Sequence, residues 1–273
     1  RIRSLEDSLG MSRAVRSARR PSLRARGEQL GLQAQALLVQ LTELPESLRR
    51  ESSGLSGDLR VTAPFGFGRH HIAPLLARFA KTHPDIRLKL ELLESPWPDK
   101  RDADAVVHIG TVRDSSWVAY PLADNERWLC ASPAYLRMHP APATPREVTA
   151  HACICIQENE EDVTLWHYRQ RTASKSRTMG GRESVRIIPA LTTNDGEVAR
   201  TWAEQGLGLV LRSQWDAAPS VARGQLVRLL DAWHFDAAPI VVLVPTRKGS
   251  TARQQALVRF MQEGFQPHPP WAG

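Results

Sequence analysis

The stretch GDLRVTAPFGFGRHHIAPLLARFAKTHPDIRLKLEL, residues 57–92, changes its hydrophobic period twice. Apolar and polar residues alternate over 58–63 and again over 86–92, which predicts two strands. A helix is predicted between them, and Pro84 ends it. One face of this helix carries Ile72, Leu75, Leu76 and Phe79. Strand, helix and strand in this order predict a parallel β-α-β unit, because parallel neighbours need a crossover connection.

Strands and helices continue to alternate toward the C-terminus. Further strands are predicted over 104–110, 152–156, 184–188, 208–211 and 239–245. A helix over 195–205 could be capped by Thr193 or Asn194, and a terminal helix follows the last strand. The alternation runs in two blocks separated by the loop HPAPATPREV, which predicts an α/β fold of two small subdomains with largely parallel sheets. The last strand and helix are expected to return to the first subdomain.

A different pattern precedes residue 57. Over 27–52 a predicted helix has apolar residues at alternating spacings of four and three, and they are Leu30, Ala34, Leu37, Leu41, Leu44 and Leu48. This spacing is that of a coiled-coil dimer helix, with a helix packed on its own domain as the alternative. Pro45 is expected to kink the helix. The hinge SSGLSGD, residues 52–58, marks the domain boundary.

Positive charge is concentrated at the start of the chain. Residues 1–29 hold eight arginines against three acidic residues, a net charge of +5, whereas the whole chain carries +7. A basic head on a nearly neutral body is typical of nucleic-acid binding. A solvated arginine-rich tail is the alternative that charge alone leaves open.

Several function classes lack support in the sequence. No apolar run approaches the ~20 residues that span a bilayer, and no signal peptide is evident, so a cytoplasmic protein is expected. No catalytic motif or dinucleotide fingerprint is found, and no cofactor is predicted. The segment HACIC places His151, Cys153 and Cys155 on one face of a strand. These three could hold a metal, but a half-buried strand face is favoured and no metal site is predicted.

Taken together, these segments resemble the LysR-type transcriptional regulators of bacteria. RIRSLEDSLG is similar to the end of that family's recognition helix, and RSARRPSLRARGEQL to its wing and the start of its linker helix. The stretch quoted first is similar to the opening of its regulatory domain. Later segments match in the expected order, namely DAVVHIG, WLCASPAYL, TTNDGEVARTWAEQGLGLVL and GQLVRLL.

The resemblance implies four parts. Residues 1–28 would be the remainder of a winged helix-turn-helix, and 29–52 the linker and dimerisation helix. Residues 58–140 with 238–267 would form regulatory subdomain I, and 141–237 subdomain II, both like a periplasmic binding protein. DNA-contacting residues would be Arg1, Arg3, Arg16, Arg19 and Arg20. Because this chain starts inside the recognition helix and has polar residues in its wing, weak DNA binding without sequence preference is expected.

The resemblance also implies a small-molecule effector, with dimers through the linker helix and tetramers through the regulatory subdomains. Two loops that open helices, PFGFGRHH and TTNDGEV, would offer backbone N–H groups to a carboxylate. The effector residues implied are Phe65, Gly66, Phe67, Ser95, Thr111, Thr193 and Asn194. Gly66 stands where many relatives have an effector-binding serine. For Thr193 and Asn194 helix capping is an equal reading, and for Phe65 and Phe67 a place in the core is favoured.

Three functional interpretations follow. The first is a LysR-type regulator that responds allosterically to a small, carboxylate-bearing effector. The alternative is a small-molecule-binding protein, or a regulator remnant, with no DNA function; the linker heptads argue against a solute receptor. An enzyme is not supported, since nothing in the sequence marks an acid–base pair.

Overall fold

The computed structural model describes residues 55–98, 103–112, 115–157, 162–171, 181–245 and 251–272, together with the backbone of β1 (Ala14–Val15) and β2 (Ser22–Leu23). The chain divides into two units, Arg1–Leu55 and Ser56–Gly273. In the first unit β1 pairs antiparallel with β2. The five arginines predicted to contact DNA and the predicted linker helix lie outside the described residues.

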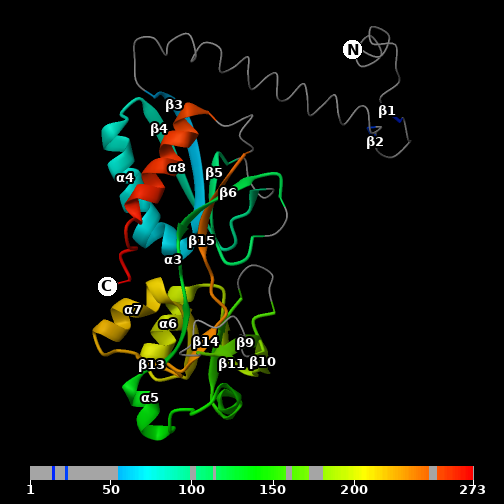
Figure 1. Ribbon diagram of the computed structural model, residues 1–273, viewed down its shortest axis with the longest axis vertical. Coiled ribbons are helices and arrows are strands. Elements are labelled where there is room, and N and C mark those ends of the chain that lie inside the picture. Colours follow the sequence, from blue (N-terminus) through cyan, green and yellow to red (C-terminus); the bar gives the residue numbers. More distant parts are fainter. Residues whose placement is uncertain are drawn as a thin grey trace. The chain divides into compact units, whose positions relative to one another are not determined.

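A five-stranded mixed sheet organises the first lobe of the second unit (Figure 1). Its strands, in spatial order, are β4 (Ile86–Leu93), β3 (Gly57–Pro64), β5 (Ala105–Ile109), β15 (Ile240–Val244) and β6 (Val118–Ala123). β4, β3 and β5 run parallel, whereas β15 and β6 join antiparallel. The predicted β-α-β unit is confirmed, and so is the return of the last strand to this lobe.

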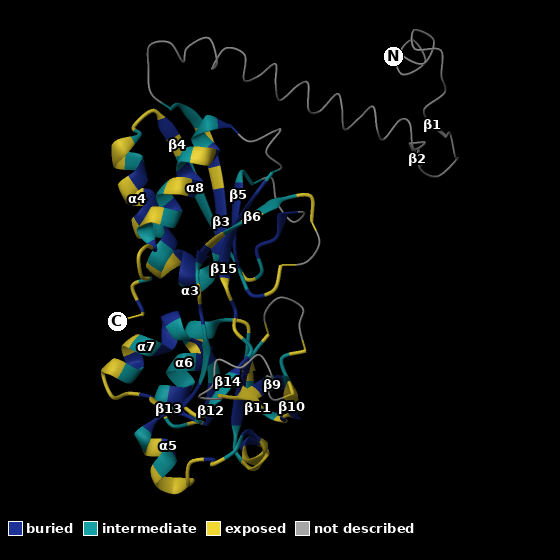
Figure 2. Ribbon diagram, in the orientation of Figure 1, coloured by how far each residue is buried: buried dark blue, intermediate teal, exposed yellow. Residues whose placement is uncertain are grey.

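Helices cover the first sheet. The crossover consists of α3 (Phe65–Phe67), a π-helical turn (Gly68–Ile72) and α4 (Ala73–Thr82), and α8 (Ala252–Gly264) closes the lobe. The predicted apolar face of the crossover is buried, as its four residues are at most 6% exposed. α8 packs against α4, and Thr251 caps it by accepting a hydrogen bond from the Gln254 backbone N–H. Figure 2 shows the central strands as the buried part of this lobe.

A second five-stranded sheet forms the other lobe. Its spatial order is β11 (Pro189–Thr193), β8 (Cys153–Ile156), β12 (Leu209–Ser213), β7 (Arg127–Ala131) and β13 (Val227–Leu229). Its helices are α5 (Pro133–Met138), a 3-10 turn (Pro145–Ala150), α6 (Gly196–Glu204) and α7 (Gln214–Ala222). A small antiparallel sheet of β10 (Glu183–Arg186), β9 (Leu165–Gln170) and β14 (Trp233–Phe235) packs beside it; its pairing was not predicted.

Three details of this lobe differ from the sequence-based expectation. The sheets are mixed rather than largely parallel, because β7 and β13 also join antiparallel. β7 belongs to the second sheet, so the chain changes lobes before β7 and not at residue 140. The N-cap of α6 is Asp195, whose carboxylate accepts hydrogen bonds from the Glu197 and Val198 backbone N–H groups. A carboxylate fits this position well, because the helix dipole favours negative charge there.

Among the helices that the structure describes, none combines the length and the apolar character needed to cross a membrane.

Candidate functional site

The chain passes between the lobes twice, after β6 and before β15, and one side chain ties the two crossings together. Asn125, 1% exposed, donates from Nδ2 to the Ala238 carbonyl at 2.9 Å and to Ser213 Oγ at 3.1 Å. The Ala238 N–H in turn donates to the Asn125 carbonyl at 2.9 Å. The crossings are therefore fixed to each other and to the start of α7.

A cavity of about 600 Å³ lies at the ends of the central strands. Its walls come from β5 in the first lobe and from β7, β8, β12 and β9 in the second. A volume of this size is typical of a small-molecule site, and so is a position at the carboxyl ends of parallel strands. The cavity is the candidate binding site of the protein.

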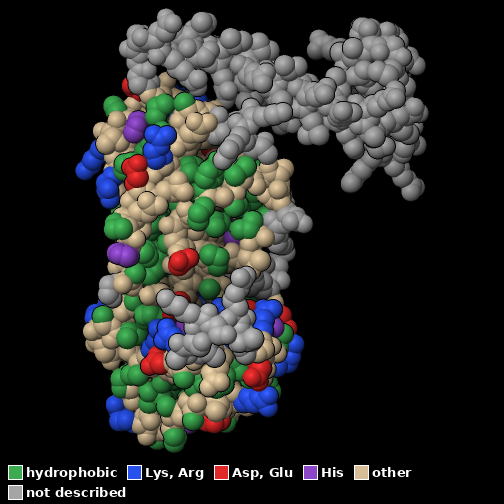
Figure 3. Space-filling view, viewed as in Figure 1, with side chains coloured by type: hydrophobic (Ala, Val, Ile, Leu, Met, Phe, Trp, Pro, Cys, Tyr) green, Lys and Arg blue, Asp and Glu red, His purple; other side chains and the backbone are tan. Residues whose placement is uncertain are grey.

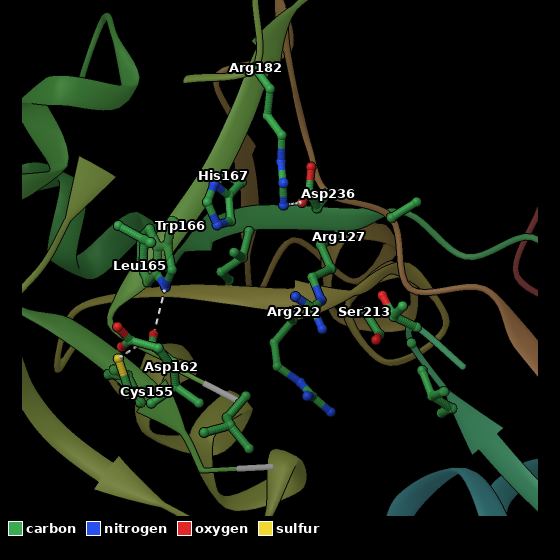
Figure 4. A pocket seen from close by; sticks show the side chains of 18 residues that line it. Arg127, Cys155, Asp162, Leu165, Trp166, His167, Arg182, Arg212, Ser213 and Asp236 are labelled. Atoms are coloured by element: carbon green, nitrogen blue, oxygen red, sulfur yellow. Dashed lines mark hydrogen bonds and ion pairs between the residues drawn. The ribbon is translucent and has the colours of Figure 1, made fainter. Parts of the chain in front are cut away.

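Several charged side chains line this cavity and determine which ligand charge it favours (Figure 4). Arg182 enters from one side and pairs with Asp236. Arg127 and Arg212 extend from the neighbouring strands β7 and β12. The remaining acid, Asp162, pairs with Arg186 outside the cavity at 3.0 Å. Since both lining acids already have arginine partners, the cavity favours an anionic ligand over a cationic one.

Arg212 is the most deeply buried of these arginines. Its side chain is 5% exposed, and its Nε donates to Asp216 Oδ2 at 2.8 Å. The other oxygen of Asp216 accepts from Arg200 Nε at 3.1 Å, and Arg200 Nη1 pairs with Glu204 at 2.7 Å. Burial alone would lower the pKa of Arg200, but the charge of Asp216 and the bond to Glu204 raise it above its ordinary value. The four side chains form a charge-balanced chain from the cavity to α6 and α7, in which Arg212 and Asp216 are buried and Arg200 and Glu204 are partly buried.

A smaller hollow of about 40 Å³ adjoins the cavity and shares Ile109, Arg212 and Ser213 with it. Four residues predicted to bind the effector line it, and they are Phe65, Gly66, Phe67 and Asn194. Its volume is enough for water but not for an organic acid. The structure therefore brings these four residues together beside the larger cavity rather than around it.

The contacts in this hollow join the lobes. Asn194 Nδ2 donates to Glu94 Oε2 at 3.1 Å, and Arg69 pairs with Glu197 at the start of α6. Glu94 directly follows β4 of the first lobe, so its bond to Asn194 reaches the second lobe. The hollow thus acts as a contact zone between the lobes.

The other predicted effector residues are distributed differently. Thr111 lines the larger cavity, whereas Ser95 and Thr193 line neither hollow. Thr193 Oγ1 accepts from the Asp195 N–H at 3.1 Å, which is a local role at the helix start.

The glycine at position 66 is explained by the space available there. A Cβ at this position would lie 3.1 Å from Trp215 Cη2, closer than ordinary side-chain contacts allow. Trp215 of α7 therefore occupies the space that a serine would need, and it also contacts Phe67 edge-on with ring centroids 5.3 Å apart. Where a serine side chain is expected from the family resemblance, this chain has the ring of Trp215 from the other lobe.

The cysteines of HACIC lie in the core of the second lobe. Cys153 and Cys155 are at most 2% exposed and belong to the cluster that packs β8 against β9, which confirms the strand-face reading. Burial raises the pKa of Cys153 to about 12 and that of Cys155 to about 11. In the part of the chain that the structure describes, no group of three potential metal ligands is found.

The segment RSQWD, residues 212–216, is the site element that sequence reasoning missed. It supplies Arg212 and Ser213 to both hollows, Trp215 to the contact zone, and Asp216 to the buried ion pairs. Its signal was an arginine at the end of an otherwise apolar strand, followed after four residues by an acid, a spacing that allows pairing across a helix start.

Two lobes joined by paired crossings, with a cavity lined from both, define a ligand-binding domain of the periplasmic-binding-protein type. Residues 52–266 match the family described as LysR substrate binding domain. The chain belongs to the LysR-type transcriptional regulators, and this cavity lies in its effector-binding domain.

Two similar proteins agree with this assignment to the LysR-type regulators. The chain is 30% identical over 272 residues to the HTH-type transcriptional regulator DmlR of Escherichia coli K12, covering 99% of this chain and 85% of DmlR. It is 31% identical over 231 residues to the HTH-type transcriptional activator TtdR of Escherichia coli UTI89, covering 84% and 72%. Both relatives are named as regulators and not as enzymes.

Solved structures show the same fold. The LysR-type regulator CrgA of Neisseria meningitidis is similar with a TM-score of 0.63 and 26% identity, over 96% of this chain and 87% of CrgA. The full-length virulence activator AphB of Vibrio cholerae has a TM-score of 0.66 at 24% identity, over 96% and 87%. The two-lobed architecture predicted from the sequence is confirmed.

Proposed function

We propose that this protein controls transcription in response to a small organic acid bound in the larger cavity. The observation that carries the proposal is the cavity of about 600 Å³ with the buried Arg212 in its wall. A guanidinium group recognises a carboxylate through paired N–H donors, and it does so most strongly away from water. A further polar group of the acid would meet Thr111, which also lines the cavity.

The proposed mechanism is allosteric. An acid held between β5 of the first lobe and β12 of the second would favour one arrangement of the lobes over others, and the free-energy difference is the ligand's differential affinity. Regulatory domains that pair between chains would transmit the change in lobe arrangement to the DNA-binding domains. Dimers through the linker helix, and tetramers through the regulatory lobes, belong to this proposal, as does DNA as the partner in the cytoplasm.

The surface charge of the second lobe is compatible with a domain that binds its ligand inside the cavity. On the face seen in Figure 3, basic and acidic side chains of the second lobe lie side by side. Within that lobe, Arg146 pairs with Glu183 at 3.1 Å. Mixed surface charge of this kind does not favour a polyanion on this face, and the proposal therefore assigns the DNA contacts to the N-terminal unit.

Ligand-dependent thermal stability tests the effector. The full chain would be unfolded with a panel of mono- and dicarboxylic acids and with their neutral amides at equal ionic strength. An acid that binds only the folded state stabilises it by about 2.7 kcal/mol at a hundred times its dissociation constant. We expect at least one acid to raise the midpoint while its amide does not. Equal effects of acids and amides, or no effect of any acid, would contradict an anionic effector.

A second assay tests the DNA partner. Binding to a promoter fragment would be measured at several salt concentrations with and without the stabilising acid. Affinity that depends on the acid supports regulation, whereas acid binding without any DNA affinity favours the small-molecule-binding alternative.

A further inference from the structure

The first observation concerns the space around the Arg212 guanidinium. Gly196, the first residue of α6, has no side chain, and a Cβ there would overlap the guanidinium Cζ and both Nη atoms. Nη2 would be the nearest of these atoms, and even the farthest, Nη1, would lie only 2.6 Å from that Cβ. The guanidinium Cζ also lies 5.8 Å from the centroid of the Trp215 ring. The guanidinium therefore lies in a slot bordered by the start of α6 and by a tryptophan.

The second observation is the orientation that Asp216 imposes. This carboxylate is 6% exposed and receives Arg212 through Nε. A bond to Nε fixes the plane of a guanidinium while the two Nη groups project from its far edge. That edge borders Gly196. Arg212 lines both hollows, so a ligand in the cavity can reach this side chain.

The third observation is a hydroxyl beside this edge. Ser213 Oγ accepts a hydrogen bond from Asn125 Nδ2 at 3.1 Å, and Ser213 also lines both hollows. A hydroxyl that accepts one hydrogen bond retains its proton as a donor. Ser213 is the N-cap residue of α7 but makes no side-chain cap bond to that helix, so its proton is not used there.

We propose that Arg212 and Ser213 bind the carboxylate of the effector, and that Gly196 and Asp216 are the positioning residues that make this possible. The inference rests on the proposed function and adds the atoms that recognise the acid. A carboxylate would accept from an Arg212 Nη group and from the Ser213 hydroxyl, next to the N-terminus of α6, whose dipole adds to the attraction. Ligands with a single planar carboxylate beside a short polar chain fit this arrangement, and their amides and alcohols do not.

The arrangement also explains why the slot needs a glycine. The start of α6 brings the positive end of a helix dipole toward a positive guanidinium, and the carboxylates of Asp195 and Asp216 offset this juxtaposition. A bound carboxylate stabilises the same juxtaposition directly. A side chain at position 196 would separate the two and remove this shared site.

Gly196→Ala is the sharpest test, because it adds one methyl group and changes no charge. We expect the variant to bind the stabilising acid about 10- to 100-fold more weakly by calorimetry, as loss of a hydrogen bond to a charged group predicts. Gly181→Ala is the matched control, since a Cβ there meets nothing within 4 Å. It should bind the acid as the unchanged protein does.

Two further variants separate the roles. Arg212→Met should lose both affinity and the preference for acid over amide. Asp216→Asn should weaken acid binding but keep part of that preference, because the guanidinium stays and only its orientation is released. Urea unfolding of each variant checks that the domain is folded, and if Arg212→Met does not fold, Gly196→Ala carries the test alone.

The outcomes distinguish this inference from the function on which it rests. Unchanged acid affinity in folded Gly196→Ala or Arg212→Met overturns the inference and leaves an anionic effector in place. Absence of any stabilising acid for the unchanged protein overturns the proposed function, and the inference falls with it. Selective loss of acid binding in Gly196→Ala, with none in Gly181→Ala, supports both.

Discussion

Replacing Asn125 by alanine should lower the free energy of unfolding by about 3 kcal/mol, because this amide holds both crossings between the lobes. The substitution removes the bonds to the Ala238 carbonyl and to Ser213 Oγ, at 2.9 and 3.1 Å. It also removes a weak bond of 3.5 Å from the Trp215 N–H. The surroundings are dry, since Asn125 is 1% exposed and Ala238 likewise.

The magnitude follows from the groups left behind. A buried polar group that loses its partner costs about 1–3 kcal/mol. The Ala238 carbonyl bears this cost fully, the Ser213 hydroxyl can turn toward the cavity and bears less, and the long Trp215 bond contributes little. About 3 kcal/mol in a domain of this size corresponds to a fall in the melting midpoint of about 6–12 °C.

Equilibrium urea unfolding followed by far-UV circular dichroism measures the change. The matched control is Asn194→Ala, which loses one exposed bond to Glu94 and should cost less than about 0.5 kcal/mol. A loss below about 1 kcal/mol for Asn125→Ala, or equal losses for the two variants, would show that the crossings do not depend on this amide. The reasoning that Asn125 holds the two crossings together would then be refuted.

Three other outcomes are expected. Burial lowers the pKa of His71 from 6.5 to about 4; the charge of His70 adds to this shift and that of Asp216 opposes it. Between these two pH values the unfolded chain binds a proton that the folded chain does not, so the free energy of unfolding should fall by about 1–2 kcal/mol from pH 6.5 to pH 4, after allowance for solvent screening. A His71→Asn variant should show a shallower dependence of this free energy on pH in urea titrations. Trp271→Ala should cost about 2–4 kcal/mol, because this 6% exposed ring packs on Phe67 and His71 with centroids 5.9 and 5.0 Å away; a cost under 1 kcal/mol would mean that the C-terminal segment is not part of the core. The three buried cysteines should resist a thiol-specific disulfide reagent at pH 8 until urea is added, and rapid labelling of the folded protein would contradict their raised pKa values.

Local pattern was sufficient for the first lobe. The period of the apolar residues in 57–92 identified the strand, helix and strand, because alternation and helical spacing are properties of neighbours in the chain. The same reasoning gave the strand at 152–156 and the helix that begins near 195. It failed on the α6 cap, where three capping residues in a row, Thr193, Asn194 and Asp195, left the choice to the backbone geometry.

The candidate site could be predicted only in part. Phe65, Gly66, Phe67 and Asn194 were identified through a family resemblance, and they do lie together. The segment that supplies Arg212 and Asp216 was missed, since an arginine followed after four residues by an acid is a common spacing that does not by itself mark a ligand site. Its meaning depends on Gly196 and Asn125, which are distant in sequence and adjacent in space.

Periodicity, turn residues and motif order along the chain were enough to predict the α/β class, the two lobes, the boundary near residue 57 and the family. Three features could be found only in the folded chain: which strands are antiparallel, where the chain changes lobes, and which of two adjoining hollows is large enough for a ligand. The physical reason is that volume, burial and the pairing of charges are properties of the packed chain, and residues far apart along it create them together.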